Sequence, residues 1–254
     1  RGRVGRNAGG LGERGGSQAA DHRKAADWLA EHFHTALTGA RLTLLAANTA
    51  RKLLGAPRLR RLSASLSKAS QGRLPQWTPA MPQPLRAFSL GPASNDPRPR
   101  VVYLAACVSR VMGPAFADQE QTPLLDKTRA LLEKAGYQVV FPDNADSLCC
   151  GQPFASKGYP EQAEHKRQEL INALLHASRG GLDPIYCDTS PCTLRLVQDL
   201  GESRLDLYDP VRFIRTHLVD RLAFTPQDAP VAVHVTCSTQ HLGESQALID
   251  LARL

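Results

Sequence analysis

Six cysteines are the residues of this 254-residue chain whose type and spacing could do chemistry, and all of them follow residue 100. They are Cys107, Cys149, Cys150, Cys187, Cys192 and Cys237. Thiolate sulfur is the soft ligand that holds zinc and iron–sulfur clusters. No apolar signal-peptide core follows the N-terminus, so we expect reduced thiols rather than disulfides. The cysteines therefore indicate a ligand or redox role.

The adjacent pair Cys149–Cys150 is the most distinctive part of this pattern, and it lies in a loop with Gly151 and Pro153. Neighbouring side chains point in different directions, so two adjacent sulfurs can reach two atoms of a polynuclear cluster. Gly151 lets the backbone approach another segment without a Cβ, and Pro153 restricts the loop. Scattered buried thiols of an ordinary enzyme would not explain such a pair.

Short apolar, β-prone segments precede the cysteines. Residues 101–106 lead to Cys107, residues 137–141 precede the adjacent pair, residues 184–186 lead to Cys187, and residues 231–235 lead to Cys237. Between these segments, apolar residues recur at helical spacing in residues 122–135, 159–178 and 210–222. This alternation predicts an α/β domain with a mainly parallel sheet. Ligands of such sheets bind beyond the carboxyl ends of the strands, so we expect the cysteines to converge at one edge.

The first and last of these segments resemble each other. In each, an apolar segment is followed by a cysteine and, six positions later, by a glycine: Cys107 with Gly113, and Cys237 with Gly243. Unless this is coincidence, it predicts duplicated units, of which the second needs roughly another hundred residues. The chain begins with Arg1 and ends at Leu254. We therefore expect a processed chain or a fragment that lacks most of the second unit.

The first hundred residues differ in charge from the rest. They hold 17 basic and 5 acidic side chains (17 − 5 = +12), whereas residues 101–254 hold 14 and 19 (14 − 19 = −5). Residues 1–17 are rich in Gly and Arg and are expected to be flexible. We predict three helices: one with Asp21 as its N-cap, one at 42–54 and one at 59–66. Seven prolines in residues 71–100 predict an extended linker. The predicted domains are a basic helical arm with a Pro-rich linker (1–100), a first cysteine-rich unit (101–229) and the start of a second (230–254).

Two interpretations of the basic arm stay open. It could contact nucleic acid or an anionic membrane surface, or it could be a solvated helical arm that packs on a neighbouring domain. Its arginines are not interleaved with stacking aromatics, and no nucleic-acid-binding motif is present, which favours the arm and no nucleic-acid partner. No stretch approaches the roughly 20 apolar residues of a membrane helix. We expect a cytoplasmic protein, with peripheral attachment at the inner face of the membrane left open.

The order of a single cysteine, then Cys-Cys-Gly, then a distal cysteine pair resembles the cysteine-rich CCG domain over about residues 100–254. That domain occurs, usually duplicated, in iron–sulfur oxidoreductases such as the heterodisulfide reductases. The resemblance implies that Cys107, Cys149, Cys150 and Cys192 ligate an iron–sulfur cluster, expected to be of the 4Fe-4S type. It also implies that Cys237, a further candidate for cofactor binding, belongs to the unfinished second unit.

The distal cysteines depart from the usual Cys-x-x-Cys ending of that family. Thr189 stands three positions before Cys192, and Cys187 stands five before it. Either Cys187 substitutes as a ligand or it is a strand thiol without a role. His234 could likewise contact a cluster or be an ordinary strand-end histidine. Asp188 is interpreted as a turn or capping residue rather than a general base, and no residue is assigned a catalytic role.

A narrower resemblance is to the C-terminal part of fused flavin and iron–sulfur D-lactate dehydrogenases of the cytochrome type. It lies in residues 74–82 (LPQWTPAMP), 188–193 (DTSPCT) and 234–239 (HVTCST). It implies that FAD and a ferredoxin-like domain lie elsewhere in the same full-length protein. Electrons would pass from a 2-hydroxy acid through flavin and clusters to a cytochrome or quinone. This chain carries no flavin-binding glycine motif, so it is not expected to oxidise lactate alone.

The leading hypothesis is therefore the electron-transfer part of a 2-hydroxy-acid oxidoreductase, with D-lactate the favoured substrate. Two alternatives remain. One is a structural zinc or interaction module, and the other is a thiol–disulfide redox module of the heterodisulfide type that works through the adjacent cysteine pair.

Overall fold

The structure, a computed structural model, describes residues 16–85, 96–198, 204–226 and 228–254. The stretch predicted to be flexible, residues 1–17, lies almost wholly outside the described residues. At the centre is a four-stranded sheet of β2 (Arg100–Leu104), β4 (Gln138–Val140), β5 (Ile185–Cys187) and β6 (Leu207–Tyr208), in the order β4-β2-β5-β6. All of its pairings are parallel, which confirms the predicted α/β class with a mainly parallel sheet.

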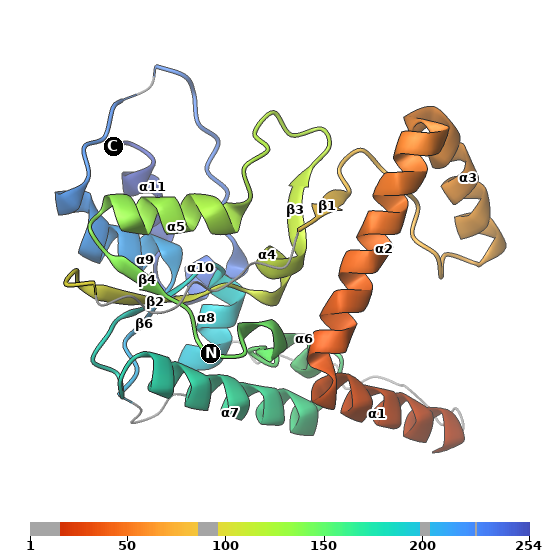
Figure 1. The fold of residues 1–254 in the computed structure, drawn as a ribbon, viewed down its shortest axis with the longest axis horizontal. Helices are drawn as coiled ribbons and strands as arrows, with labels where there is room; N and C mark the ends of the chain where they lie inside the picture. Colours follow the sequence, from red (N-terminus) through yellow and green to blue (C-terminus); the bar gives the residue numbers. More distant parts are fainter. Residues whose placement is uncertain (1–15, 86–95, 199–203, 227) are drawn as a thin grey trace, which may run out of the picture.

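Helices cover both faces of this sheet (Figure 1). On one face, α7 (Pro160–Ala177) and α8 (Ser190–Val197) pack against alternate strand residues such as Val102 and Ile185. On the other face, α5 (Leu124–Lys134) and α9 (Pro210–Phe213) pack against the residues in between, such as Val101 and Tyr103. Because both faces are buried, β2 is apolar without alternation, as parallel strands between helices usually are.

The strand predicted at residues 231–235 is wrong. These residues form no strand, and Val231 and Val233 are exposed. The place beside β5 is taken instead by β6, a two-residue strand that the apolar pattern did not reveal. The segment continues into α10 (Cys237–His241), which packs on α8, and α11 (Ser245–Leu251). Duplication of the unit is therefore not visible in this segment and stays a prediction, as do the predicted domain boundaries.

The segment predicted as a helix at 210–222 is helical but irregular. After α9 the backbone changes to a π-helix, η2 (Ile214–Leu218), and then to a short 3₁₀-helix, η3 (Val219–Arg221). The His217 ring on η2 packs edge-on against Tyr208, with centroids 4.8 Å apart, and this contact ties the π-helix to the sheet.

The basic arm forms α1 (Gly16–Glu31), α2 (Phe33–Leu54) and α3 (Ala56–Ala69). The predicted start at Asp21 is wrong, because α1 begins five residues earlier. The predicted second helix also begins earlier, at Phe33. Gly55 separates α2 from α3 with φ +78°, a left-handed value that glycine tolerates at little cost.

The arm packs on the cysteine-bearing part. Gln162 of α7 donates a hydrogen bond to Asp27 of α1, and α2 contacts α4 (Cys107–Val111) and the short η1 (Ala145–Ser147). The proline-rich stretch is not wholly a free linker, since β1 (Pro82–Pro84) pairs antiparallel with β3 (Met112–Ala115), and Trp77 is buried. Of the two interpretations of the arm, packing on a neighbouring unit agrees with these contacts.

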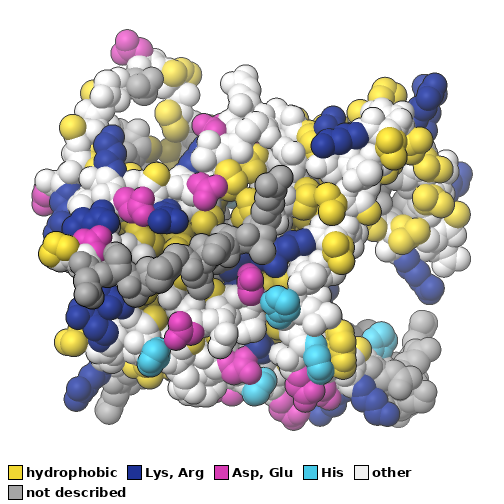
Figure 2. Space-filling view, viewed as in Figure 1, with side chains coloured by type: hydrophobic (Ala, Val, Ile, Leu, Met, Phe, Trp, Pro, Cys, Tyr) yellow, Lys and Arg dark blue, Asp and Glu magenta, His cyan; other side chains and the backbone are white. Residues whose placement is uncertain are grey.

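Large apolar side chains remain exposed on the arm (Figure 2), where they gather over α2 and α3. They include Leu42, Leu45, Leu53, Leu62 and Leu66. Within the part of the chain that the structure describes, no helix is both long and apolar enough to cross a membrane.

We call the edge of the sheet at the amino ends of its strands the amino edge. It carries ion pairs between Asp96 and Arg98, and between Asp183 and both Arg100 and Arg179. Arg100 Nε lies 3.2 Å and Arg179 Nη2 lies 2.5 Å from the Asp183 carboxylate. Asp183 is buried, and two cations compensate its charge.

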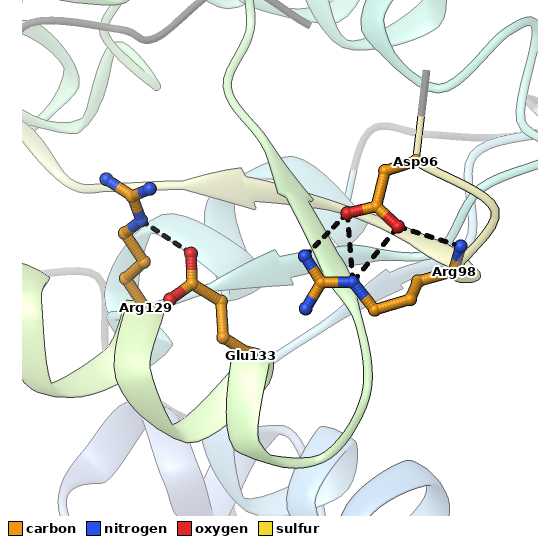
Figure 3. A network of polar contacts seen from close by, with 4 residues as sticks. All are labelled: Asp96, Arg98, Arg129 and Glu133. Carbon is orange, nitrogen blue, oxygen red and sulfur yellow. Dashed lines mark hydrogen bonds and ion pairs between the residues drawn. The ribbon is translucent and has the colours of Figure 1, made fainter. Parts of the chain in front are cut away.

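A close view of this edge (Figure 3) shows the Arg98 side chain folded back onto Asp96, just before β2. Arg98 Nε lies 2.9 Å from Asp96 Oδ2, and the Arg98 guanidinium lowers the pKa of that carboxyl. On the neighbouring α5, Arg129 and Glu133 form a second exposed pair at 2.8 Å. These charges find their partners within the protein.

Candidate metal centre

Three strand ends bring five of the six cysteines to the opposite edge of the sheet. Cys107 begins α4 directly beyond β2, Cys187 ends β5, and Cys192 lies on the following α8. Cys149 and Cys150 lie in the loop that precedes α6 (Gln152–Ala155). The predicted convergence therefore occurs, and we call these five residues the sulfur edge.

The five sulfurs contact one another in a row. Cys150 Sγ and Cys192 Sγ lie 3.2 Å apart. Side-chain hydrogen bonds also join Cys107 to Cys149, Cys149 to Cys150, and Cys187 to Cys192. Cys187 is thus an end member of the row, which favours its interpretation as a ligand over that of a thiol without a role.

These contacts distribute the protons unevenly. The pKa of Cys149 falls to about 4 because Cys107 and then Cys150 donate hydrogen bonds to its sulfur, and the pKa of Cys192 falls to about 3 because Cys150 and then Cys187 do the same. The same bonds, together with burial, raise the pKa of the three donors. Two thiolates therefore alternate with three thiols. Thiolate is the form that binds metal.

Arg110 is a cation buried beside this row. Its side chain is 2% exposed, and Nη2 donates to the carbonyl oxygen of Leu148 at 2.5 Å. Nε and Nη1 are buried and have no hydrogen-bond partner among the described residues. Burial lowers the pKa of Arg110, while electrostatic interactions with the neighbouring Cys107, Asp146 and Cys149 oppose this shift.

A buried carboxylate, Asp188, holds two strand ends together. Its Oδ1 accepts the backbone N–H of Ala106 at 2.8 Å, and its Oδ2 accepts the hydroxyl of Tyr103 at 3.0 Å. Burial raises the pKa of Asp188. These two hydrogen bonds fix the start of α4 relative to β5. They therefore also fix the position of Cys107 relative to Cys187. Asp188 is a backbone-capping residue, in agreement with its interpretation from the sequence.

Gly151 sets the position of the adjacent cysteines against α7. Its φ is +83°, and a Cβ at this position would lie 2.2 Å from the carbonyl oxygen of Ala163. The predicted close backbone approach is therefore confirmed. The Gly151 N–H also donates to Cys149 Sγ at 3.4 Å.

An apolar wall shields the sulfurs. Cys149 belongs to a cluster with Ala30, Phe33, Phe154 and Ala163, and the two phenylalanine rings lie 6.2 Å apart. Cys150 and Cys187 belong instead to the core beneath the sheet. Low polarity around the thiolates strengthens every electrostatic contact that they make.

Cys237 is not part of the row. It is exposed at the start of α10, although its neighbour Ser238 lies 2.7 Å from Ser190 of α8. His234 is exposed and lies outside any strand, so it is not a strand-end histidine. The predicted cofactor role of Cys237 therefore finds no support in the position of its side chain.

The donor set is compatible with an iron–sulfur cluster, because cysteine thiolate is the usual ligand of iron in such clusters. In the conformation described here, no three His, Cys, Asp or Glu side chains of the described residues are arranged to hold a metal ion. The orphaned N–H groups of Arg110 also call for an anion nearby.

Two contributors were missed from the sequence. Arg110 interrupts the apolar residues Val108, Val111 and Met112, and a charge in such a segment was the available signal. Nothing in the sequence around Phe33 pointed to a contact with Cys149.

Residues 101–196 match the family model of the cysteine-rich domain CCG. The match contains the whole sulfur edge and excludes Cys237. CCG is a cysteine-rich domain found in iron–sulfur oxidoreductases. No curated protein and no solved structure matches the chain.

Proposed function

We propose that this chain is the iron–sulfur electron-transfer part of a flavin-linked 2-hydroxy-acid dehydrogenase, with D-lactate as the favoured substrate. The observation that carries the electron-transfer role is the row of five thiols beside a buried cation. Cys107, Cys149, Cys150 and Cys192 would hold the cluster, and Cys187 extends this set. A cluster of the 4Fe-4S type supplies one-electron transfer when bound.

The chain's own residues hold and shield such a group. The hydrogen bonds along the row keep two sulfurs as thiolates without an external base. Asp188 and Gly151 fix the strand ends from which the sulfurs project. Phe33 and Phe154 exclude water from Cys149, which limits hydrolysis and oxidation of anything bound there.

The choice of D-lactate rests on the resemblance in residues 74–82, 188–193 and 234–239. In this proposal FAD and a ferredoxin-like domain belong to other parts of the same full-length protein, and a cytochrome or quinone accepts the electrons. The protein would work in the cytoplasm or at the inner face of the membrane, without nucleic acid.

Anaerobic purification with iron and acid-labile sulfide analysis tests the electron-transfer role. We expect iron and sulfide in comparable amounts and a broad visible absorption. Cys149→Ser and Cys150→Ser should each reduce the iron content by more than half, whereas the control Cys237→Ser should retain it. Zinc without iron or sulfide would overturn the proposal in favour of a structural zinc module.

The substrate is tested on the full-length protein. D-lactate should bleach the visible absorption of the clusters much faster than L-lactate. The clusters receive electrons only after the flavin has oxidised the substrate, and D-lactate is the proposed substrate. If neither isomer reduces clusters that dithionite does reduce, the electron-transfer role stands and the D-lactate assignment falls.

A thiol–disulfide role is the second candidate, and the 3.2 Å contact between Cys150 and Cys192 favours it. As the S–S bond forms, the Cys150 thiol and the Cys192 thiolate would lose two electrons and one proton, and these electrons, with that proton and one from solvent, reduce a low-molecular-weight disulfide to two thiols. Mass spectrometry of metal-free protein treated with glutathione disulfide should then show a Cys150–Cys192 crosslink. If the metal-free protein forms no such crosslink, the thiol–disulfide role falls. If the crosslink forms in metal-free protein but not in metal-loaded protein, the two cysteines serve as cluster ligands.

A further inference from the structure

Arg110 is a buried cation, and two of its nitrogens lack a hydrogen-bond acceptor among the described residues. It is 2% exposed, and of its hydrogen-bonding nitrogens only Nη2 has a partner, the backbone oxygen of Leu148. Nε and Nη1 are buried and find no acceptor in the described part of the chain. A buried cation without an acceptor destabilises the folded state unless an anion lies beside it.

No hydrogen bond joins Arg110 to a carboxylate in the described part of the chain. Asp146 on η1 acts on it electrostatically, but its Oδ1 is bound by Arg41 Nη2 at 2.9 Å. Arg41 reaches in from α2 and also donates to the backbone oxygen of Arg110 at 3.1 Å. A second cation therefore lies close by, and Asp146 serves it as well.

The remaining neighbours are sulfurs. Arg110 lies three residues after Cys107 on α4, and its charge acts on Cys107, Cys149 and Cys192, which come from three different segments. The guanidinium thus interacts electrostatically with cysteines from three segments of the sulfur edge, and its Nη2 binds the carbonyl oxygen directly before Cys149. Its planar fork presents several N–H donors in a fixed geometry, which an ammonium group does not.

We propose that Arg110 is the built-in counter-ion of a sulfur-ligated centre, to which its Nε–H and Nη1–H donate hydrogen bonds, and that it raises the reduction potential of that centre. This inference rests on the proposed electron-transfer function. Reduction adds one electron and so one negative charge beside the guanidinium. A fixed positive charge at low polarity stabilises the reduced form more than the oxidised form. Arg110 is a positioning residue in this role, not a catalytic one.

The test compares Arg110→Gln and Arg110→Lys with Arg129→Gln. Arg129 is a matched control, because it loses the same charge but lies exposed at the amino edge in a pair with Glu133. Each protein is titrated anaerobically with dithionite while visible absorption and electron paramagnetic resonance report the reduced fraction. Iron and sulfide are measured in the same samples.

At the wild-type midpoint potential, Arg110→Gln should show at least a tenfold lower ratio of reduced to oxidised centre, which equals a shift of about 59 mV for one electron. Arg110→Lys keeps the charge but loses the fork, so its shift should be smaller. Arg129→Gln should titrate as the wild type does. Variants with full iron and sulfide and an unchanged potential would overturn the inference while leaving the proposed function intact.

Loss of the centre is also informative. If Arg110→Gln folds by circular dichroism but holds little iron, Arg110→Lys decides the question. Restored iron in the lysine variant supports the counter-ion role, and equal loss in both variants overturns it in favour of a packing role. Wild-type protein without iron and sulfide would instead sink the proposed function itself.

Discussion

The two edges of the central sheet differ in whether their buried charged groups have partners of opposite charge. At the amino edge the buried carboxylate of Asp183 is compensated by Arg100 and Arg179, and Asp96 is compensated by Arg98. At the sulfur edge Arg110 keeps two nitrogens without an acceptor in the described residues, and thiolates alternate with thiols. At the amino edge Arg100 Nε makes no hydrogen bond but faces the Asp183 carboxylate at 3.2 Å, whereas no ion pair of Arg110 is found among the described residues.

This difference separates stability from function. A buried polar group with its partners present holds the fold together, whereas one that lacks partners destabilises the fold and persists where a ligand completes it. Both edges belong to the same strands, so variants of one edge are natural controls for the other. The predictions below use this pairing.

The largest effect is expected from two glycines, one at each edge. Gly151→Ala and Gly181→Ala would each bring a Cβ within about 2 Å of a carbonyl oxygen, 2.2 Å at Ala163 and 2.1 Å at Arg204, with φ positive at both. Strain and overpacking together should lower the free energy of unfolding by about 3 kcal/mol in each. Urea unfolding measures this loss. Only Gly151→Ala should also reduce bound iron, because only Gly151 adjoins the cysteine pair.

Gly158→Ala is the control for backbone strain. Gly158 has the same φ of +83° as Gly151, but nothing lies within 4 Å of its Cβ position. It should lose only about 1 kcal/mol. An equal loss in Gly151→Ala and Gly158→Ala would show that the loop yields and that the close approach to α7 does not fix the cysteines.

Asp183→Asn should break the amino edge without affecting the sulfur edge. It removes the charge that compensates Arg100 and Arg179, and Arg100 is mostly buried. We expect a loss of about 2 kcal/mol in urea unfolding, below the value for a fully buried pair because Arg179 is half exposed. Iron content per folded molecule should stay at the wild-type value. A parallel loss of iron would mean that the two edges are coupled through the strands.

Asp188→Asn makes the complementary change at the sulfur edge. The amide keeps one oxygen for the N–H of Ala106 or the hydroxyl of Tyr103 but not for both, so about 1–2 kcal/mol should be lost. Cys107 should become more mobile and react faster with a thiol reagent. An unchanged rate at Cys107, with Asp183→Asn as control, would contradict the role of Asp188 as a tie between strand ends.

The smallest effect concerns Asp209, which caps α9 just beyond β6. Its Oδ1 accepts the backbone N–H of Arg212, but its Oδ2 has no hydrogen-bond partner in the described residues, and burial raises its pKa. The folded state therefore binds the Asp209 proton more tightly than the unfolded state, and this group's contribution to stability falls as pH rises above about 3.8. Asp209→Asn should be more stable than the wild type at pH 7 by less than about 1 kcal/mol.

The pH dependence of stability distinguishes Asp209 from Asp96. The advantage of Asp209→Asn should shrink as pH falls from 7 to 4, because the wild-type carboxyl then becomes protonated. Asp96→Asn at the amino edge should behave oppositely: Arg98 lowers the pKa of Asp96, so the wild type loses its advantage over that variant as pH falls. Urea unfolding at several pH values measures both. The same trend in the two variants would contradict the contrast between the edges.

The sequence was most informative where local pattern and topology agree. The alternation of apolar segments with helical spacing predicted β2, β4, β5, α5 and α7, since each pattern is long enough to exceed chance. Convergence of the cysteines followed from a general property of parallel sheets and needed no distances. Gly151 could be interpreted because Cys-Cys-Gly makes a close backbone approach plausible before the approaching helix is known.

Other features depend on contacts that a sequence does not reveal. Residues 231–235 have the composition of a strand, yet β6 occupies the place beside β5, and Val231 and Val233 stay exposed. The pairing of β1 with β3 was hidden because Pro82 and Pro84 lack the N–H groups that signal a strand. That Arg110 Nε and Nη1 lack an acceptor in the described residues emerges only from the folded structure, in which Arg41 binds Asp146.

The apolar wall formed by Ala30 and Phe33 has a consequence for the order of assembly. These two residues come from the N-terminal helices, whereas the sulfurs that they cover come from much later in the chain. In the proposed function, a cluster would have to reach Cys149 before the N-terminal helices pack over it, or these helices would have to move away again. Maturation would then depend on when the protein's own N-terminal segment docks.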